Sequence, residues 1–175
     1  MTHIDRGALK YLIEAFDLDS MIDIGCGTGH MVKFAQDKGL EAVGIDGDVS
    51  LINTWKRVGI SYGVHDYSQS PLGSTPYDLC WAVEFLEHIN EKYLDNVFET
   101  INNCQVVCMT HALPNARGYN HVNCQPEDYW VTMFESHGFE LDETATQKVR
   151  EVSTMSKDFM RNTGNVFIHC LACES

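Results

Sequence analysis

The residues best suited to chemistry lie in one glycine-rich segment, residues 23–29, which reads Asp-Ile-Gly-Cys-Gly-Thr-Gly. A short apolar run, residues 21–24, leads into this segment, and residues 31–38 behind it have the composition of a helix. A strand, a tight glycine turn and a helix expose bare main chain at the carboxyl end of a buried strand, where a ligand can lie against the backbone. The pattern therefore predicts a ligand site at residues 23–29.

The spacing of the glycines distinguishes two protein families that share this arrangement of strand, glycine turn and helix. The dinucleotide-binding fingerprint, Gly-x-Gly-x-x-Gly, needs its third glycine at position 30, which is His30 in this chain. The spacing thus disfavours a nicotinamide-dependent oxidoreductase. Here Gly25, Gly27 and Gly29 alternate, and Asp23 stands two residues before the first of them. This segment resembles the first motif of class I S-adenosylmethionine (SAM) methyltransferases.

The elements that would position this turn alternate along the chain. Apolar residues at helical spacing predict a leading helix in residues 5–17. Near-continuous apolar residues in 104–110 indicate a strand inside a sheet that is covered on both faces. The other predicted strands are residues 21–24, 41–46, 60–65, 77–83, one that begins at 139–141, and 164–173. Between the strands we predict a helix that ends near residue 38 and further helices in residues 49–58, 93–102 and 126–137.

This alternation predicts an α/β fold with a parallel sheet. A terminal pair of strands after the last helix brings the total to seven, which is the class I methyltransferase pattern. The resemblance implies a Rossmann-like, seven-stranded, mostly parallel sheet with helices on both faces, whose last strand runs antiparallel between the fifth and sixth. We expect a single domain over residues 1–175, with a leading helix in 1–18 and substrate or lid segments in 111–125 and 142–163.

Three acids at the ends of consecutive predicted strands acquire roles from the resemblance. Asp46 corresponds to the carboxylate that binds both ribose hydroxyls of SAM, and a carboxylate can accept two hydrogen bonds at once. Asp66 corresponds to the acceptor of the adenine amino group, and Asp23 to the acid that holds the glycine turn and faces the methionine amino group. The predicted residues that bind SAM, or its product S-adenosylhomocysteine (SAH), are Asp23, Gly25, Cys26, Gly27, Gly29, Asp46, Gly47, Asp66, Tyr67, Val83 and Glu84.

A hydroxyl acceptor would also need a group that removes its proton. Glu84 and His88 belong to a Glu-x-x-Glu-His segment after the fourth strand, and His111 and His121 lie in the polar connection after the fifth. In a parallel sheet these side chains would all reach the mouth of the SAM pocket. We predict His121 or His111 as the catalytic base, with Glu84 and His88 shaping the site.

The acceptor class follows from a second, looser resemblance. Residues 111–130, with His-Ala-Leu-Pro at 111–114 and Tyr-Asn-His-Val-Asn at 119–123, are similar to a stretch of small methyltransferases from bacteria and their phages. Several of those groups are thought to act on sugars or other small hydroxylated molecules. The resemblance implies O-methylation of a small hydroxylated acceptor, with carbohydrates among the candidates.

Two alternatives stay open. The small-RNA 3′-end 2′-O-methyltransferases bind a divalent metal ion with the same Glu-x-x-Glu-His segment and a later histidine, which would be Glu84, Glu87, His88 and His121 here. Because Glu-x-x-Glu-His also occurs widely in methyltransferases that use no metal, the sequence favours a metal-free site. The other alternative is a SAM-binding protein without transferase activity, a sensor or accessory subunit.

The composition restricts the partners and the compartment. The 175 residues include 12 basic and 25 acidic ones, a net charge of −13, which disfavours attraction to nucleic acid. The chain shows no apolar run of membrane-spanning length and no signal peptide, and its seven cysteines are odd in number. We therefore expect a cytoplasmic protein with reduced thiols and no membrane partner. The sequence does not indicate an oligomeric state. Four basic residues of 142–163 would either lie on a solvated helix or contact an anionic acceptor: Lys148, Arg150, Lys157 and Arg161.

Overall fold

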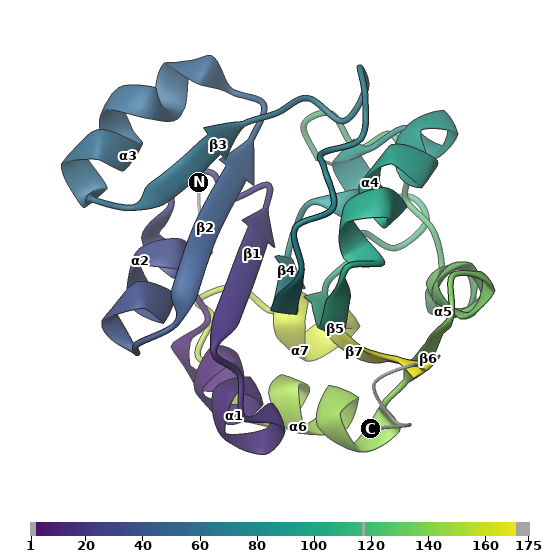
Figure 1. The fold of residues 1–175 in the computed structure, drawn as a ribbon. Coiled ribbons are helices and arrows are strands. Elements are labelled where there is room, and N and C mark those ends of the chain that lie inside the picture. The colour runs from purple at the N-terminus through teal and green to yellow at the C-terminus, as the bar shows by residue number, and fades with distance from the viewer. Residues whose placement is uncertain (1–2, 117, 171–175) are drawn as a thin grey trace.

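The strands form one seven-stranded sheet with the order β3-β2-β1-β4-β5-β7-β6 in the computed structural model, which describes residues 3–116 and 118–170 (Figure 1). β7 is antiparallel to both of its neighbours, and all other pairings are parallel. The predicted Rossmann-like sheet, with its last strand between the fifth and the sixth, is confirmed. The strands are β1 (Ser20–Ile24), β2 (Glu41–Asp46), β3 (Ser61–Val64), β4 (Tyr77–Ala82), β5 (Cys104–Met109), β6 (Phe139–Leu141) and β7 (Asn165–His169).

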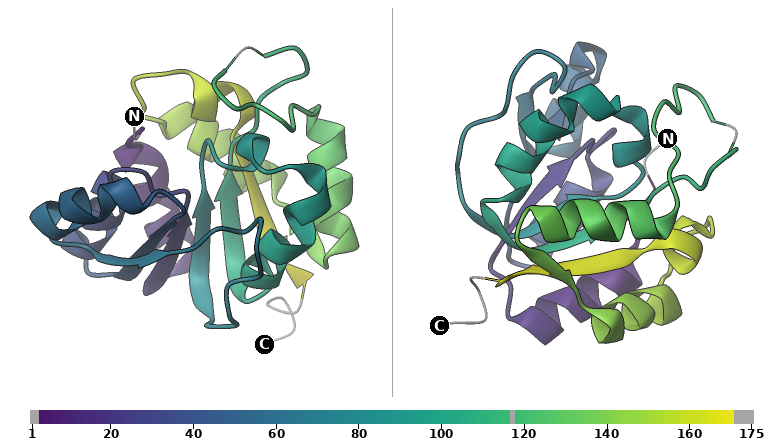
Figure 2. Two further views of the ribbon diagram at one scale, coloured as in Figure 1. Left: turned by 90° about the horizontal axis from the view of Figure 1, so that it is seen from above. Right: turned by 90° about the vertical axis from the view of Figure 1, so that its right-hand side faces the viewer.

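Helices cover both faces of the sheet, as Figure 2 shows from above. On one face α1, α2, α3, α6 and α7 bury their apolar residues in a shared cluster, and α4 and α5 do so on the other. The α-helices are α1 (Arg6–Phe16), α2 (His30–Asp37), α3 (Ile52–Val58), α4 (Leu94–Ile101), α5 (Glu127–Ser136), α6 (Glu143–Val152) and α7 (Phe159–Thr163). Short 3₁₀ turns are η1 (Val49–Leu51), η2 (Leu86–His88) and η3 (Glu91–Tyr93).

The interior strand β5 shows why the sheet needs two layers of helices. Successive side chains of a strand point to opposite faces. Accordingly Val106 and Cys108 join the cluster under α1 and α6, whereas Val107 and Met109 join the cluster under α4 and α5. All four are at most 4% exposed. The near-continuous apolar sequence of this strand is thus explained by burial on both faces.

The site-forming edge of the sheet is set by the position of β1. The chain runs outward from β1 to β2 and β3, and then returns to β4 and β5 on the other side. At such a reversal the loops that follow the two central strands separate, and a crevice opens at their carboxyl ends. The loop after β5, α7 and the N-terminal segment gather at the same edge (Figure 2).

Two elements differ in detail from the prediction. The expected helix 49–58 begins as the 3₁₀ turn η1, because the Asp48 side chain accepts a hydrogen bond from the Ser50 N–H and starts a tighter turn. The expected last strand, 164–173, ends as β7 at His169, and its residues 171–173 lie outside the described part of the chain.

The basic residues of 142–163 have partners within the protein. The Arg150 guanidinium donates to Glu127 Oε1 at 2.9 Å and to the Gly164 carbonyl at 2.7 Å. Arg161 donates to Asp158 Oδ1 at 2.8 Å and to backbone carbonyls around it. Both guanidinium groups therefore hold the ends of α6 and α7 in place, and we no longer expect them to contact an anionic acceptor.

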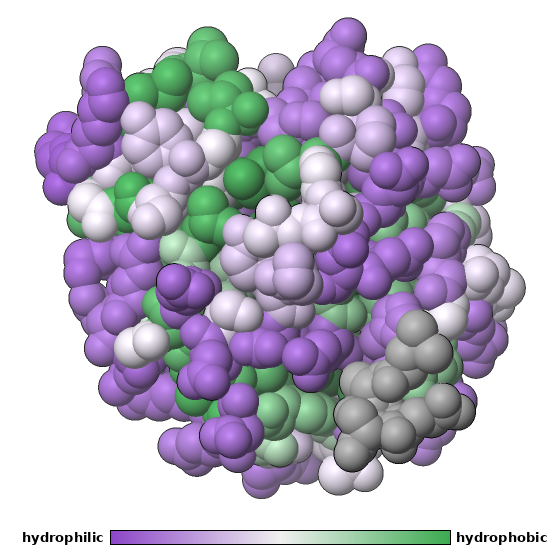
Figure 3. All heavy atoms as spheres, viewed as in Figure 1, coloured by the Kyte–Doolittle hydropathy of each residue, from purple (hydrophilic) through white to green (hydrophobic). Residues whose placement is uncertain are grey.

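The outer surface is mostly polar. In the face shown in Figure 3, hydrophobic residues appear in small groups, one of them over α3. None of the helices in the described residues is long and apolar enough to cross a membrane.

The side chain of Asp5 joins the start of α1 to the end of α6, and its removal should destabilise the fold. It is fully buried and accepts hydrogen bonds from the Ala8 and Thr154 N–H groups at 3.1 and 2.9 Å, and from the Ser153 hydroxyl. We predict that Asp5→Ala lowers the free energy of unfolding by about 2–4 kcal/mol, because three donors lose a buried charged acceptor. The exposed cap Asp48 is the matched control, and Asp48→Ala should cost about 1 kcal/mol or less. Equal losses in urea titrations of the two variants would contradict this role.

Candidate functional site

The glycine turn after β1 is held in a fixed shape by hydrogen bonds. The Gly25 and Cys26 N–H groups donate to the Ile45 carbonyl at 2.8 and 3.1 Å, and the Gly27 N–H donates to Asp46 Oδ2 at 2.9 Å. Gly25 has φ +76°, and a Cβ there would lie 2.4 Å from the Phe85 ring. Only glycine fits this position, so the main chain stays bare as the sequence predicts.

Two adjoining pockets extend along the carboxyl edge from this turn. One is lined by Asp23, Gly25, Cys26, Gly27 and Val83, and the other by Gly25, Asp46, Gly47, Asp66 and Tyr67. Because both are also lined by Glu84 and His88, we treat them as one crevice. The residues predicted to bind SAM thus meet in one place, with one exception. Gly29 lines neither pocket, and its main chain packs against Ile60, whose Cδ1 would lie 2.3 Å from an added Cβ.

The three acids of the crevice differ in their surroundings. Asp66 is exposed and accepts a hydrogen bond from the Ser68 N–H at 2.8 Å. Asp46 accepts from the Gly27 and Asp48 N–H groups, one to each carboxylate oxygen. Asp23 is only 4% exposed. Burial, and then the charge of Asp46, raises the pKa of Asp23 well above its ordinary value, because both disfavour the ionised carboxylate.

Glu84 begins the turn that follows β4, in a conformation that another side chain supports. Its φ is +56°, a left-handed value that side chains other than glycine rarely adopt. The buried Thr110 hydroxyl accepts from the Glu84 N–H at 2.8 Å and donates to Glu84 Oε1 at 2.9 Å. Thr110 therefore fixes both the main chain and the carboxylate of Glu84.

Glu87, one of the residues of the alternative metal set, is the most deeply buried acid of that set. Its side chain is fully buried, and neither carboxylate oxygen has a hydrogen-bond partner. Burial, followed by the charge of Glu84, raises the pKa of Glu87 to about 8. A buried carboxyl group without partners is unfavourable unless a ligand or ion completes its surroundings.

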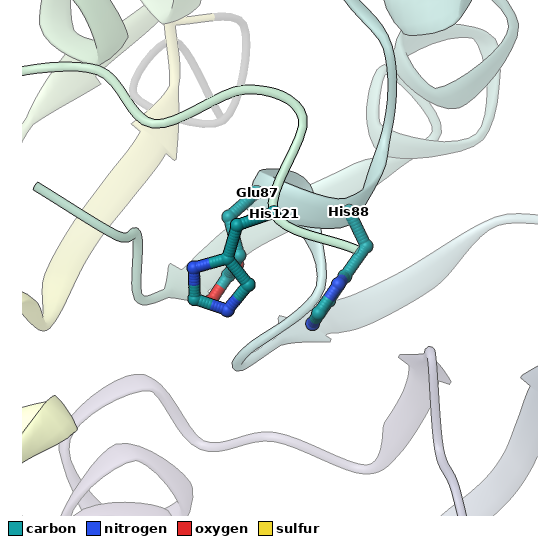
Figure 4. Close-up of side chains that lie close together, drawn as sticks. All are labelled: Glu87, His88 and His121. Atoms are coloured by element: carbon teal, nitrogen blue, oxygen red, sulfur yellow. The ribbon is translucent and has the colours of Figure 1, made fainter. Parts of the chain in front are cut away.

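Two histidines face Glu87. One potential ligand atom each from Glu87, His88 and His121 lies within 4.8 Å of the other two, and Figure 4 shows Glu87 and His88 on η2 and His121 reaching them from the loop after β5. His88 Nδ1 lies 3.1 Å from the Asn120 carbonyl. Since a carbonyl only accepts, Nδ1 carries a proton and donates it to this carbonyl, so Nε2 is the nitrogen that can face a ligand.

The loop that carries His121 is anchored to η2 through the main chain. The Val122 and Asn123 N–H groups donate to the Glu87 carbonyl at 2.9 and 3.0 Å. His121 Nδ1 is buried without a partner, and burial, followed by His88, lowers the pKa of His121. Gly118 lies against the other edge of the ring, where an added Cβ would be 2.1 Å from Nε2. The imidazole is thus neutral and closely confined.

His111 lies next to this cluster, and one of its two ring nitrogens has no hydrogen-bond partner. It is 2% exposed, and its Nδ1 lies 3.1 Å from the Gln125 carbonyl, so Nδ1 carries the proton. Nε2 is buried and has no partner. Burial lowers the pKa of His111, which keeps the ring neutral and Nε2 available as an acceptor. His111 lines a cavity together with Glu84, Glu87 and His121.

Sequence reasoning missed Thr110. It could have been found, because it directly follows a strand whose carboxyl end faces the crevice. Gly118, Phe159 and Thr163 also border the site, within the segments 111–125 and 142–163 that were predicted to contact substrate, but the sequence did not single them out. Only the tertiary structure defines the path of these segments.

Comparison with known proteins identifies the family to which this chain belongs. Residues 3–144 match the family model of a methyltransferase domain. A search of curated proteins found no match to the sequence.

Several solved structures share the fold. A TehB-like SAM-dependent methyltransferase from Corynebacterium glutamicum is 19% identical, with a TM-score of 0.67 over 94% of this chain and 89% of that one. The magnesium protoporphyrin IX methyltransferase of Synechocystis, solved with bound SAH, is 15% identical, with a TM-score of 0.67 over 92% and 80%. The methyltransferase domain of bacterial CtHen1 is 16% identical, with a TM-score of 0.66 over 93% and 95%.

The hydrogen bonds between Thr110 and Glu84 can be tested by measuring the stability of Thr110 variants. We predict that Thr110→Val lowers the free energy of unfolding by about 1–3 kcal/mol, because the buried Glu84 N–H and carboxylate each lose a partner while the volume is kept. Thr110→Ser retains the hydroxyl and should lose less than half as much. A chemical denaturation series in which valine and serine behave alike would contradict the hydrogen-bonding role.

Proposed function

This chain belongs to the family of class I SAM-dependent methyltransferases, and on that basis we propose that it methylates a hydroxyl group with the help of a divalent cation. The sequence alone favours a metal-free site. Here we adopt instead the metal-binding site that the sequence left open as an alternative. The observation that carries it is the buried Glu87 carboxyl group, whose two oxygens have no hydrogen-bond partner and which lies beside the two histidines His88 and His121. Glu84, Glu87, His88 and His121 would hold the cation.

The residues present fit such an ion. Two carboxylates and two imidazoles suit a borderline divalent cation such as Mn²⁺. The Nδ1–H group of His88 donates to a main-chain carbonyl, as metal-binding histidines commonly do, and this leaves Nε2 free to bind. Thr110 holds Glu84 at the edge of the cluster. When bound, the cation would supply a positive charge that lowers the pKa of an acceptor hydroxyl.

His111 is the residue we propose as general base. Its Nε2 is buried, unprotonated and without a partner, and the ring lines the same cavity as Glu84, Glu87 and His121. The lowered pKa keeps the ring in the form that can accept a proton from a hydroxyl. This assignment separates the two histidines that the sequence leaves equivalent: His111 takes the proton, and His121 binds the cation.

The crevice would hold SAM, which supplies an electrophilic methyl group on its sulfonium. We assign Asp46 to the ribose hydroxyls, because each of its oxygens accepts only one main-chain N–H and retains a second lone pair. Asp66 would accept the adenine amino group, and Asp23 would face the methionine ammonium. Glu84 and Val83 line the crevice beside the cluster, where the methyl group must meet the acceptor.

Cation binding is the first test of this function. We predict that Mn²⁺ titrated into the purified protein binds at a single site, and that Glu87→Gln and His121→Ala each weaken binding at least about tenfold, since each removes one ligand. Calorimetry, or the loss of the free-ion electron paramagnetic resonance signal, would measure this.

The matched control is His30→Ala, which removes a histidine that lines neither the crevice nor the cavity. It should bind Mn²⁺ as the wild type does. Circular dichroism melts of all variants establish that they fold. No saturable binding by the wild type, or equal binding by Glu87→Gln, would contradict the proposal.

The buried Asp23 predicts that SAH binding depends on pH. Because its pKa is raised in the free protein, Asp23 is partly protonated below that pKa, and a bound ammonium group should drive the proton off. SAH affinity should therefore rise with pH from the ordinary carboxyl range up to the raised pKa and then level off. Calorimetry in buffers of different ionisation enthalpy should detect proton release, which Asp23→Asn abolishes. A release that persists in Asp23→Asn would exclude this group.

A further inference from the structure

A second cavity, open to solvent on one side, adjoins the proposed cation site. Its volume is about 220 Å³. Glu84 and His121 line both this cavity and the crevice, so they form the partition between the two. A group that enters the cavity would therefore lie next to the cation ligands and within reach of the cofactor crevice.

The cavity is lined by both polar and apolar side chains. We call Glu84, Glu87 and His111 the polar wall; there, Nε2 of His111 and both oxygens of Glu87 have no partner. The lining also includes the apolar side chains Ala112, Leu113 and Phe159. Such a site fits a molecule that is polar at one end and apolar over the rest of its body, because a few polar groups orient the ligand and apolar contacts hold it.

The charge of the site limits the acceptor further. Among the described residues that line the cavity and the crevice, none is lysine or arginine. The nearby Arg150 and Arg161 are engaged by Glu127, Asp158 and main-chain carbonyls. A phosphate chain would therefore find no cationic side chain at the site, and the net charge of −13 would repel it.

We propose that this cavity is the acceptor subsite and that the acceptor is an uncharged compound with a hydroxyl group at one end of a compact apolar body. The inference rests on the proposed function and adds to it the class of substrate. The cavity is smaller than the roughly 300–1,000 Å³ of typical ligand pockets, which favours a compact group over a polymer. The hydroxyl lies at the polar wall, and the apolar body lies against Leu113 and Phe159.

The test compares three probes on the full chain loaded with SAH and Mg²⁺. 4-Methylcatechol has hydroxyls on an uncharged apolar body, methyl α-glucoside is uncharged but polar throughout, and a six-residue oligoribonucleotide is polyanionic. We expect 4-methylcatechol to bind most tightly by calorimetry. Leu113→Ser should weaken its binding roughly three- to tenfold, because an apolar contact is lost.

Val64→Ser is the matched control, because Val64 and Leu113 are similarly exposed, at 44% and 50%, and Val64 lines neither the cavity nor the crevice. It should leave probe binding unchanged. Tighter binding of the oligoribonucleotide, no binding of 4-methylcatechol, or an effect of Leu113→Ser no larger than that of Val64→Ser would overturn the inference. Because SAH and cation binding are measured first on the same samples, such a result would leave the proposed function standing.

Discussion

The buried carboxylate of Glu87 is the constraint on which the site depends. Burying a carboxyl group without a partner is unfavourable, and burial raises the pKa of Glu87 to about 8, so its position must be maintained by the rest of the structure. Main-chain contacts do this: the Glu87 carbonyl accepts two N–H groups from the loop that carries His121, and His88 donates to the carbonyl of Asn120. The backbone thus assembles the cluster before any ion is present, and the side chains keep their ligand atoms unused.

The same edge of the sheet concentrates negative charge. Asp23, Asp46, Asp66 and Glu84 lie at or near the carboxyl ends of parallel strands and line the crevice there, and burial and the charge of Asp46 raise the pKa of Asp23. No lysine or arginine among the described lining residues balances them. The ligands of the family reaction provide the missing positive charge, since SAM carries a sulfonium and an ammonium group and the proposed cation adds more. This explains how an acidic protein can be suited to a reaction whose cosubstrate is cationic.

Much of the fold could be predicted from the sequence because its signals are local. Each of these signals extends over only a few residues. Alternating apolar runs predicted the sheet, and Gly25 in a turn and the acids Asp23, Asp46 and Asp66 at strand ends predicted the crevice. The sequence offered Glu84, Glu87, His88 and His121 as a possible metal site but could not decide whether they bind an ion. Whether the oxygens of Glu87 find partners depends on residues such as His121, which are distant in the chain. The surroundings of Arg150 stayed open for the same reason, because its partner Glu127 lies 23 positions away.

The central claim is that Glu87 and its neighbours hold a divalent cation beside the SAM crevice. Its most direct test is a crystal structure of the protein grown with Mn²⁺ and SAH, with anomalous scattering data collected near the manganese edge. The account predicts one strong anomalous peak within bonding distance of Glu87, His88 and His121, with SAH in the adjoining crevice. An ordered SAH with no anomalous peak at this cluster, or a peak elsewhere in the chain, would contradict it.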